Sequence, residues 1–148
     1  MKSLQQLILV LGTCLAVASF AQEPVAPATP RFVADIELET EDDLSQLLTR
    51  AGQLFLEGKV KQEHGAVVLV LHGPVLRSLS RNNYAQSQAV VNQAASLTAL
   101  GVLEIKACRS WMGNNGMPVE DLQPFVEVVS YGPEEVTRLV EDEGYIFF

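Results

Sequence analysis

The sequence predicts an α/β fold, with a mainly parallel sheet of about five strands and helices on both of its faces. Three observations lead to this prediction. Short runs rich in branched apolar residues alternate along the chain with longer segments of helical periodicity. The run "AVVLVLHG", residues 66–73, is almost continuously apolar, which is typical of a parallel strand covered on both faces. Two further apolar runs are each followed by a segment with helix-start residues, as repeated strand–helix units require.

The first half of the predicted domain contains two strands and two helices. Residues 31–38, "RFVADIEL", alternate as a strand does, and Thr40 then caps a helix whose first turn is acidic and which ends near Gly58. The apolar face of this helix consists of Leu44, Leu47, Leu48, Ala51, Leu54 and Phe55. After the strand at 66–73, the segment 83–100 has no helix breaker and predicts a second helix. Its inward residues are Val90, Val91, Ala94 and Leu97, with Leu100 as a further candidate.

The second half repeats the alternation with shorter elements. "VLEIKAC", residues 102–108, and "VEVVSYG", residues 126–132, are strands. Between them we expect one helical turn at 110–114 and a second short helix after Pro118. Pro133 begins a final helix that runs to Gly144, and "YIFF", residues 145–148, is a terminal strand. The inward side of that helix consists of Val136, Leu139 and Val140.

The amino-terminal residues predict export. Residues 1–21 contain one lysine, an apolar run and a small-residue pattern that predicts signal-peptide cleavage after Ala21. The run is shorter than the roughly 20 apolar residues of a membrane-spanning helix. Residues 22–30 contain three prolines and form a predicted tether, and residues 31–148 form a single predicted domain. We therefore expect a periplasmic or secreted protein without a membrane anchor after cleavage.

The charge balance excludes some partners. Ten basic residues stand against eighteen acidic ones, for a net charge of −8, and no basic cluster is present. Nucleic acids and anionic membranes both select a basic face. The sequence therefore predicts neither nucleic acid nor membrane as a partner.

Cysteine usage singles out one residue. The chain has two cysteines, and removal of the signal peptide with Cys14 leaves Cys108 alone in an oxidising compartment. Cys108 ends a predicted strand, at the edge of the sheet where α/β proteins bind ligands. His72 ends another predicted strand at the same edge. The start of the following helix, Arg109, Lys106 and His72 are each able to favour the thiolate, His72 only if the two strands are neighbours.

Other interpretations of these residues stay open. Cys108 also fits a small buried apolar residue, and His72 fits a turn residue that bonds to the backbone. His64 lies in a polar loop and fits a solvated side chain, and a zinc site from His64, His72 and Cys108 would lack a fourth ligand. Trp111 and Met112 fit residues that pack a short helix against the sheet. No phosphate-binding glycine motif or other cofactor motif is present, so no cofactor is predicted.

From about Ala66 onward, the sequence resembles the DsrE/DsrF-like family of sulfur-relay proteins. The resemblance depends on "HGP" after a long apolar strand and on a strand-ending cysteine followed at four-residue steps by an apolar residue and a glycine, here Cys108, Met112 and Gly116. It implies a three-layer α/β/α sandwich and assembly into homo-oligomers such as trimers or hexamers. It also implies a persulfide on Cys108, passed between a sulfur donor and an acceptor protein.

Three hypotheses follow for the function. In the first, an exported sulfur-handling protein uses Cys108 as its persulfide nucleophile, Arg109 to stabilise the thiolate and His72 as a polar partner. In the second, a non-enzymatic oligomer binds a small ligand and Cys108 is packed at a subunit interface. In the third, Cys108 is a redox sensor that becomes oxidised.

Overall fold

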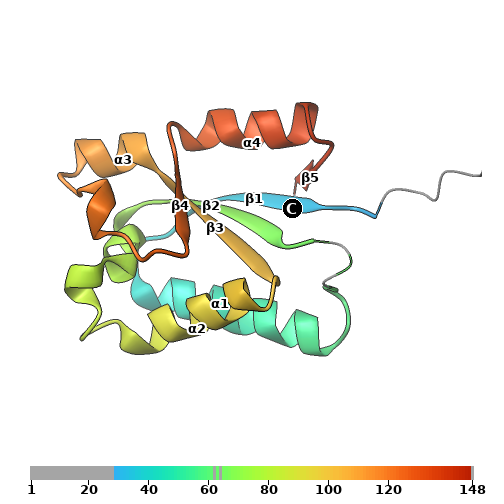
Figure 1. Cartoon of the computed structure of the whole chain (residues 1–148), viewed down its shortest axis with the longest axis horizontal. Helices are drawn as coiled ribbons and strands as arrows, with labels where there is room; N and C mark the ends of the chain where they lie inside the picture. Colours follow the sequence, from blue (N-terminus) through green and yellow to red (C-terminus); the bar gives the residue numbers. More distant parts are fainter. Residues whose placement is uncertain (1–28, 62, 64, 148) are drawn as a thin grey trace, which may run out of the picture.

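A parallel sheet lies at the centre of the computed structural model, which describes residues 29–61, 63 and 65–147 (Figure 1). Within these residues the strand order is β4-β3-β2-β1-β5, and all neighbouring strands are parallel. The strands are β1 (Phe32–Glu37), β2 (Val67–His72), β3 (Leu103–Cys108), β4 (Val126–Val129) and β5 (Ile146–Phe147). The predicted signal peptide, most of the predicted tether and His64 lie outside the described residues.

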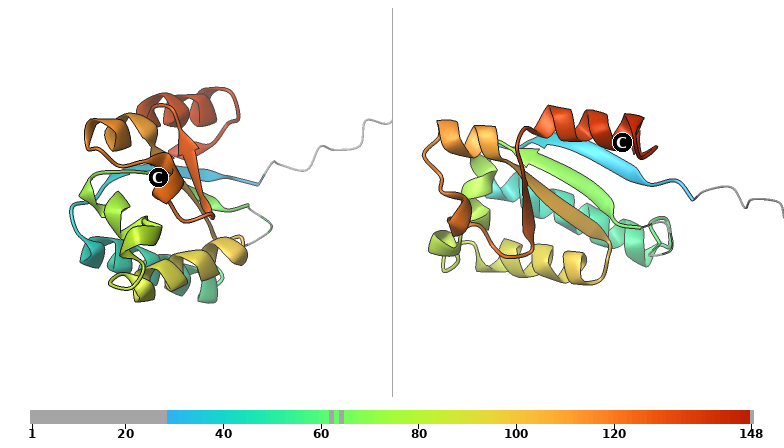
Figure 2. Two further views of the ribbon diagram at one scale, coloured as in Figure 1. Left: turned by 60° about the vertical axis from the view of Figure 1, so that its left-hand side comes forward. Right: turned by 45° about the horizontal axis from the view of Figure 1, so that its top comes forward.

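Helices cover the sheet on both faces and complete a three-layer α/β/α sandwich, as predicted (Figures 1 and 2). One face is covered by α1 (Glu41–Leu56) and α2 (Gln88–Ala99), and the other by α4 (Gly132–Glu141). The short helix α3 (Arg109–Asn114) lies at the carboxyl end of β3 and packs Met112 into the core under α1 and α2. The strands β1 to β4 follow one another across the sheet, and α4 then returns over the sheet to place β5 beside β1. Because parallel crossovers are right-handed, this reversal of direction puts α4 on the face opposite α1 and α2.

Alternating side chains of the strands build a separate core on each face. Leu71 and Ile105 belong to the larger core, under α1 and α2. Val68 and Val70 belong to the smaller core, under α4, together with Val136 of that helix. Cys108 alternates with Ala107 and therefore lies on the α4 face.

The start of α1 is fixed by a reciprocal cap at the predicted residue. The Thr40 side chain accepts a hydrogen bond from the Asp43 N–H at 3.2 Å, and the Asp43 carboxylate accepts one from the Thr40 N–H at 3.1 Å. This capping box satisfies two backbone donors that would otherwise have no partner.

The second predicted helix starts later than expected. Residues 74–79 and 81–83 form the 3₁₀ helices η2 (Pro74–Leu79) and η3 (Arg81–Asn83), and α2 begins only at Gln88. The Ser80 side chain accepts from the Asn82 N–H, and such local side-chain bonds compete with an α-helix. The inward prediction for Leu100 is wrong, because this residue caps the end of α2 and is 48% exposed.

The later elements are shorter than their apolar patterns. The predicted strand at 126–132 ends at Val129, since Gly132 is already the first residue of α4. The short helix after Pro118 is the 3₁₀ helix η4 (Val119–Asp121), and α4 ends at Glu141 rather than near Gly144. The early start of α4 brings its first backbone N–H groups to the end of β3.

Candidate functional site

Cys108 and His72 end neighbouring strands at the carboxyl edge of the sheet. The register between β2 and β3 pairs Leu71 with Ala107, which places His72 and Cys108 at the next position along the two strands. The sequence had left open whether these strands are adjacent. Their adjacency brings together two of the three predicted site residues.

The Cys108 thiol is free, buried and bonded to the backbone of α4. The side chain is 1% exposed, and the Gly132 N–H donates a hydrogen bond to Sγ at 3.3 Å. Gly132 is the first residue of a ten-residue helix, so its N–H lies at the positive end of the helix dipole. The thiol sulfur therefore accepts a hydrogen bond from a backbone donor at a helix start.

Gly132 also brings the thiol and the imidazole to one place. A β-carbon added at this position would lie 3.5 Å from Cys108 Cβ and 3.6 Å from His72 Cε1. It would lie only 3.1 Å from Val70 Cγ1 as well, closer than most real contacts of this kind. Because glycine has no side chain, the start of α4 can approach both Cys108 and His72. The sequence predicts Gly132 only as the last residue of a strand.

His72 is held by an aspartate that the sequence analysis missed. His72 Nε2 lies 2.6 Å from Asp35 Oδ1, across the pair of strands β1 and β2. This carboxylate oxygen is buried and has no other hydrogen-bond partner among the described residues, so a proton on Nε2 would satisfy it. With Nε2 protonated, the neutral imidazole keeps Nδ1 as its proton acceptor. The sequence did contain one indication of Asp35, because it is a charged residue within a predicted strand of the sheet.

Lys106 does not serve the thiol, contrary to one expectation from the sequence. Its ammonium Nζ lies 2.8 Å from a carboxylate oxygen of Glu127, 3.0 Å from one of Glu104 and 3.4 Å from one of Glu135. Burial lowers the pKa of Lys106, but hydrogen bonds to Glu127 and Glu104 outweigh it, so the pKa lies above its ordinary value. The lysine is a charged centre of a carboxylate cluster beneath α4.

Arg109 begins α3 directly after Cys108 and is exposed. Within residues 29–61, 63 and 65–147, its side chain makes no hydrogen bond or ion pair. It therefore presents an unpaired cation at the surface, next in sequence to the buried sulfur.

Two hydrogen bonds from Ser110 fix the connection between β4 and α4. The Ser110 backbone N–H and hydroxyl both donate to the Ser130 carbonyl oxygen, at 3.3 and 2.9 Å. Ser130 lies between the end of β4 and Gly132, so these bonds fix the connection that carries the Gly132 N–H to Sγ. We call residues 130–132 and Ser110 the latch.

The short helix after the cysteine packs as predicted. Met112 is fully buried in the larger core, and Trp111 is partly buried against it. In the described part of the chain, no group of three or more His, Cys, Asp or Glu side chains is arranged to hold a metal ion.

The fold and the site together define an α/β/α sandwich with a buried thiol at the carboxyl edge of its parallel sheet. No protein-family model matches the chain, and no curated protein matches it either. A solved structure is similar: that of a protein of unknown function, MTH1491, from Methanobacterium thermoautotrophicum, with 22% identity and a TM-score of 0.62. The match covers 80% of this chain and 97% of that one, and it supports the fold alone.

No helix among the described residues is long and apolar enough to cross a membrane.

Proposed function

We propose that this protein handles sulfur through a persulfide on Cys108. The observation that carries the proposal is the hydrogen bond from the Gly132 N–H, at the start of α4, to Cys108 Sγ. A backbone donor at a helix start is poised to stabilise a thiolate or a terminal persulfide anion. The nearby His72, bonded through Nε2 to Asp35, supplies a base for the thiol proton.

The chemistry is a pair of sulfur transfers. His72 takes the thiol proton, and the Cys108 thiolate attacks the outer sulfur of a donor persulfide. A new S–S bond forms on Cys108 as the donor S–S bond breaks, and the donor leaves as a thiolate. An acceptor thiolate then attacks the outer sulfur, takes it as its own persulfide and regenerates the Cys108 thiolate. The sequence consumes no external oxidant or reductant.

Asp35 and Arg109 have supporting roles in this proposal. The Asp35 carboxylate stabilises the imidazolium that forms when His72 accepts the proton. Arg109, exposed at the start of α3, adds positive charge where an anionic persulfide approaches. The DsrE/DsrF-like resemblance supports the same assignment of Cys108, since some members of that family carry sulfur on the matching cysteine.

The proposal extends to setting and partners. It assumes export through cleavage after Ala21 to the periplasm or the exterior, a homo-oligomer of the trimer or hexamer kind, and separate sulfur donor and acceptor proteins. None of these partners is a nucleic acid or a membrane.

Transfer requires the latch to open, because Cys108 is 1% exposed. The hydroxyl bond from Ser110 to Ser130 closes it, and a neutral hydrogen bond contributes about 1 kcal/mol. Ser110→Ala should therefore raise the rate of Cys108 alkylation about fivefold, because opening precedes reaction. Ser96→Ala, which removes an exposed hydroxyl-to-backbone bond in α2, is the matched control.

The decisive experiment is intact mass after exposure to polysulfide. We expect a gain of one sulfur that a reducing agent reverses, and no gain in Cys108→Ser. His72→Gln should slow the uptake while the fold, measured by circular dichroism, stays intact. Sulfur uptake that persists in Cys108→Ser, or that is absent from the wild-type protein, would reject the proposal.

A packed and unreactive thiol is the second candidate, and the 1% exposure of Cys108 favours it. In this case the protein is a non-enzymatic oligomer that binds a small ligand. The native protein would then resist a thiol reagent near neutral pH, while the unfolded protein would react fully. Peroxide-dependent gain of oxygen at Cys108, without sulfur uptake, would instead identify a redox sensor.

A further inference from the structure

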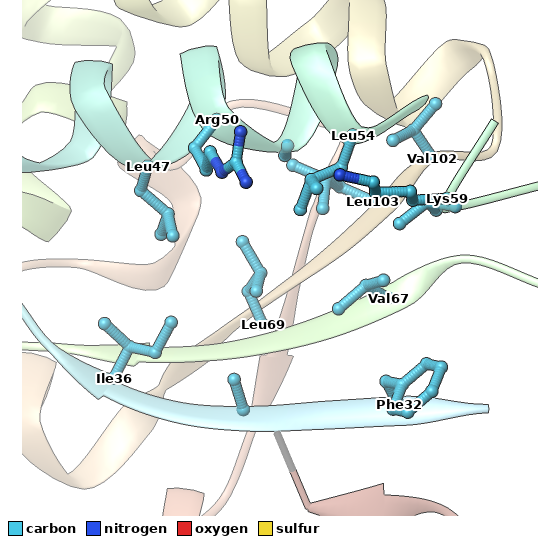
Figure 3. A pocket seen from close by; sticks show the side chains of 13 residues that line it. Phe32, Ile36, Leu47, Arg50, Leu54, Lys59, Val67, Leu69, Val102 and Leu103 are labelled. Carbon is cyan, nitrogen blue, oxygen red and sulfur yellow. The ribbon is translucent and has the colours of Figure 1, made fainter. Parts of the chain in front are cut away.

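A cavity lies between α1 and the sheet, on the face opposite to the one where Cys108 contacts α4 (Figure 3). Its volume is about 460 Å³, within the range of small-molecule sites. One wall is a stripe of α1 that includes Leu47, Ala51 and Leu54, and the other consists of strand residues that include Phe32 and Leu69. The lining residues Phe32, Val67 and Leu103 lie at the starts of β1, β2 and β3, and along β1 the cavity extends to Ile36.

Among the described residues, two that line the apolar cavity are charged, and both are cations. Arg50 follows the same α1 stripe, three residues after Leu47, and Lys59 follows the end of the helix. In Figure 3 their side chains lie at the helix side of the cavity. The protein as a whole has a net charge of −8, so the local sign at this cavity is opposite to the overall one.

Arg50 is the cation available to a ligand. The Arg50 guanidinium donates a long hydrogen bond of 3.4 Å to Gln53 Oε1, whereas the Lys59 ammonium already pairs with the Glu57 carboxylate at 2.8 Å. A guanidinium on an exposed helix surface has free donors for a carboxylate, and it can bind two oxygens at once. An apolar chamber beside such a group matches a molecule with an apolar body and one anionic end.

We propose that this cavity binds a small amphipathic monocarboxylate, whose apolar chain enters between α1 and the sheet and whose carboxylate pairs with Arg50. Apolar burial supplies the affinity, and the arginine selects the charge of the head group. The site is independent of the sulfur chemistry proposed for Cys108, because the cavity lies under α1 whereas Cys108 contacts α4 on the other face of the sheet.

The probe is decanoate, at a concentration below that of micelle formation. Calorimetry measures its binding to purified protein, whose amino terminus is established by mass spectrometry. Decanol and decylamine test the head group with the same apolar chain. We expect saturable binding of one decanoate per chain, weaker binding of decanol and weakest binding of decylamine. Cys108→Ser should bind decanoate as the wild type does.

The matched variants separate charge from packing. Arg50→Gln should weaken decanoate binding about tenfold and leave decanol binding unchanged. Arg109→Gln removes the same charge next to Cys108 in the sequence and should have no effect on decanoate. Ala51→Phe fills the cavity and should abolish both ligands, with folding checked by circular dichroism.

Four results would overturn the proposal. The first is the absence of saturable decanoate binding by the wild-type protein. The second is equal binding of decanoate and decylamine, and the third is an unchanged decanoate affinity in Arg50→Gln. The fourth is adsorption of the protein to phosphatidylcholine vesicles without binding of free decanoate, which would assign the apolar surface to a membrane.

Discussion

Replacement of Lys106 by methionine should destabilise the fold without altering the reactivity of the neighbouring thiol. Lys106 lies two residues before Cys108 on the same face of β3, so its charge is a natural candidate for activation of the sulfur. The structure instead bonds its ammonium to three carboxylates beneath α4. Methionine keeps the length and apolar stem of the side chain and removes only the charge and its donors.

The expected loss of unfolding free energy is about 2 kcal/mol. The side chains of Glu104 and Glu127 are 42% and 57% exposed, so each of their pairs contributes about 0.2–1 kcal/mol. The Glu135 side chain is 13% exposed, and its contact is more strongly desolvated but longer, at 3.4 Å. Glu135 keeps two bonds from Arg138, at 2.8 and 2.9 Å, so removal of the lysine does not leave it without a cation. This remaining partner keeps the loss below the roughly 3–5 kcal/mol of a fully orphaned buried charge.

Urea denaturation at neutral pH measures the loss, and alkylation of the native protein measures the thiol. Lys61→Met is the matched control, since Lys61 is exposed and pairs with Glu63 at 3.4 Å. We expect a change below about 0.5 kcal/mol for this control and an unchanged alkylation rate of Cys108 in both variants. A Lys106→Met protein as stable as the control, or one whose Cys108 reacts much more slowly at equal stability, would refute the structural role of this lysine.

Three further predictions concern the fold. Thr40→Ala removes one half of the capping box and should lower the free energy of unfolding by about 1 kcal/mol in urea denaturation, whereas Thr40→Ser should restore most of it. Gly73→Ala should cost about 3 kcal/mol or more, because φ is +97° and a β-carbon would lie 2.5 Å from the Leu38 carbonyl oxygen; near-normal thermal stability would contradict this. A hydrogen bond from Arg138 lowers the pKa of the Glu135 carboxyl in the folded protein from its ordinary value of 4.5. The ionised carboxylate therefore stabilises the fold above pH 4.5, and this contribution is lost as the pH falls through the pKa of the folded state. Glu135→Gln should therefore be less stable at pH 7 and should lose less stability than wild type on acidification, a difference that denaturation across pH would reveal.

The sequence predicts the sandwich well because burial imposes simple patterns on it. The apolar run of β2 and the stripe of α1 must face a core, and the start of α1 has an acidic first turn behind Thr40. Boundaries are less predictable where local side-chain bonds compete with helices. Ser80 and its neighbours favour 3₁₀ turns, and this delays α2 to Gln88 although no proline or glycine interrupts the segment.

The site is less predictable because its partners come from distant parts of the chain. The sequence placed Cys108 and His72 at one edge, since both end strands, but it contained no sign of strand order. The helix start that contacts Sγ belongs to α4, 24 residues later, rather than to α3, which follows the cysteine directly. Asp35 was missed for a similar reason, since its contact with His72 depends on the neighbouring positions of β1 and β2.

Burial of Cys108 is compatible with the proposed sulfur transfer because a backbone connection, the latch, contacts the sulfur and lies partly at the surface. The bonds of the latch join Ser110 to Ser130 and Gly132 to the sulfur. Ser130 and Tyr131 are exposed, so water can replace a broken latch bond at low cost. Opening would remove the Gly132 donor from the sulfur, and closing would restore it to a thiolate or persulfide. Under the proposed chemistry, the same contacts would protect a loaded sulfur in the closed state and set the rate at which it meets a partner.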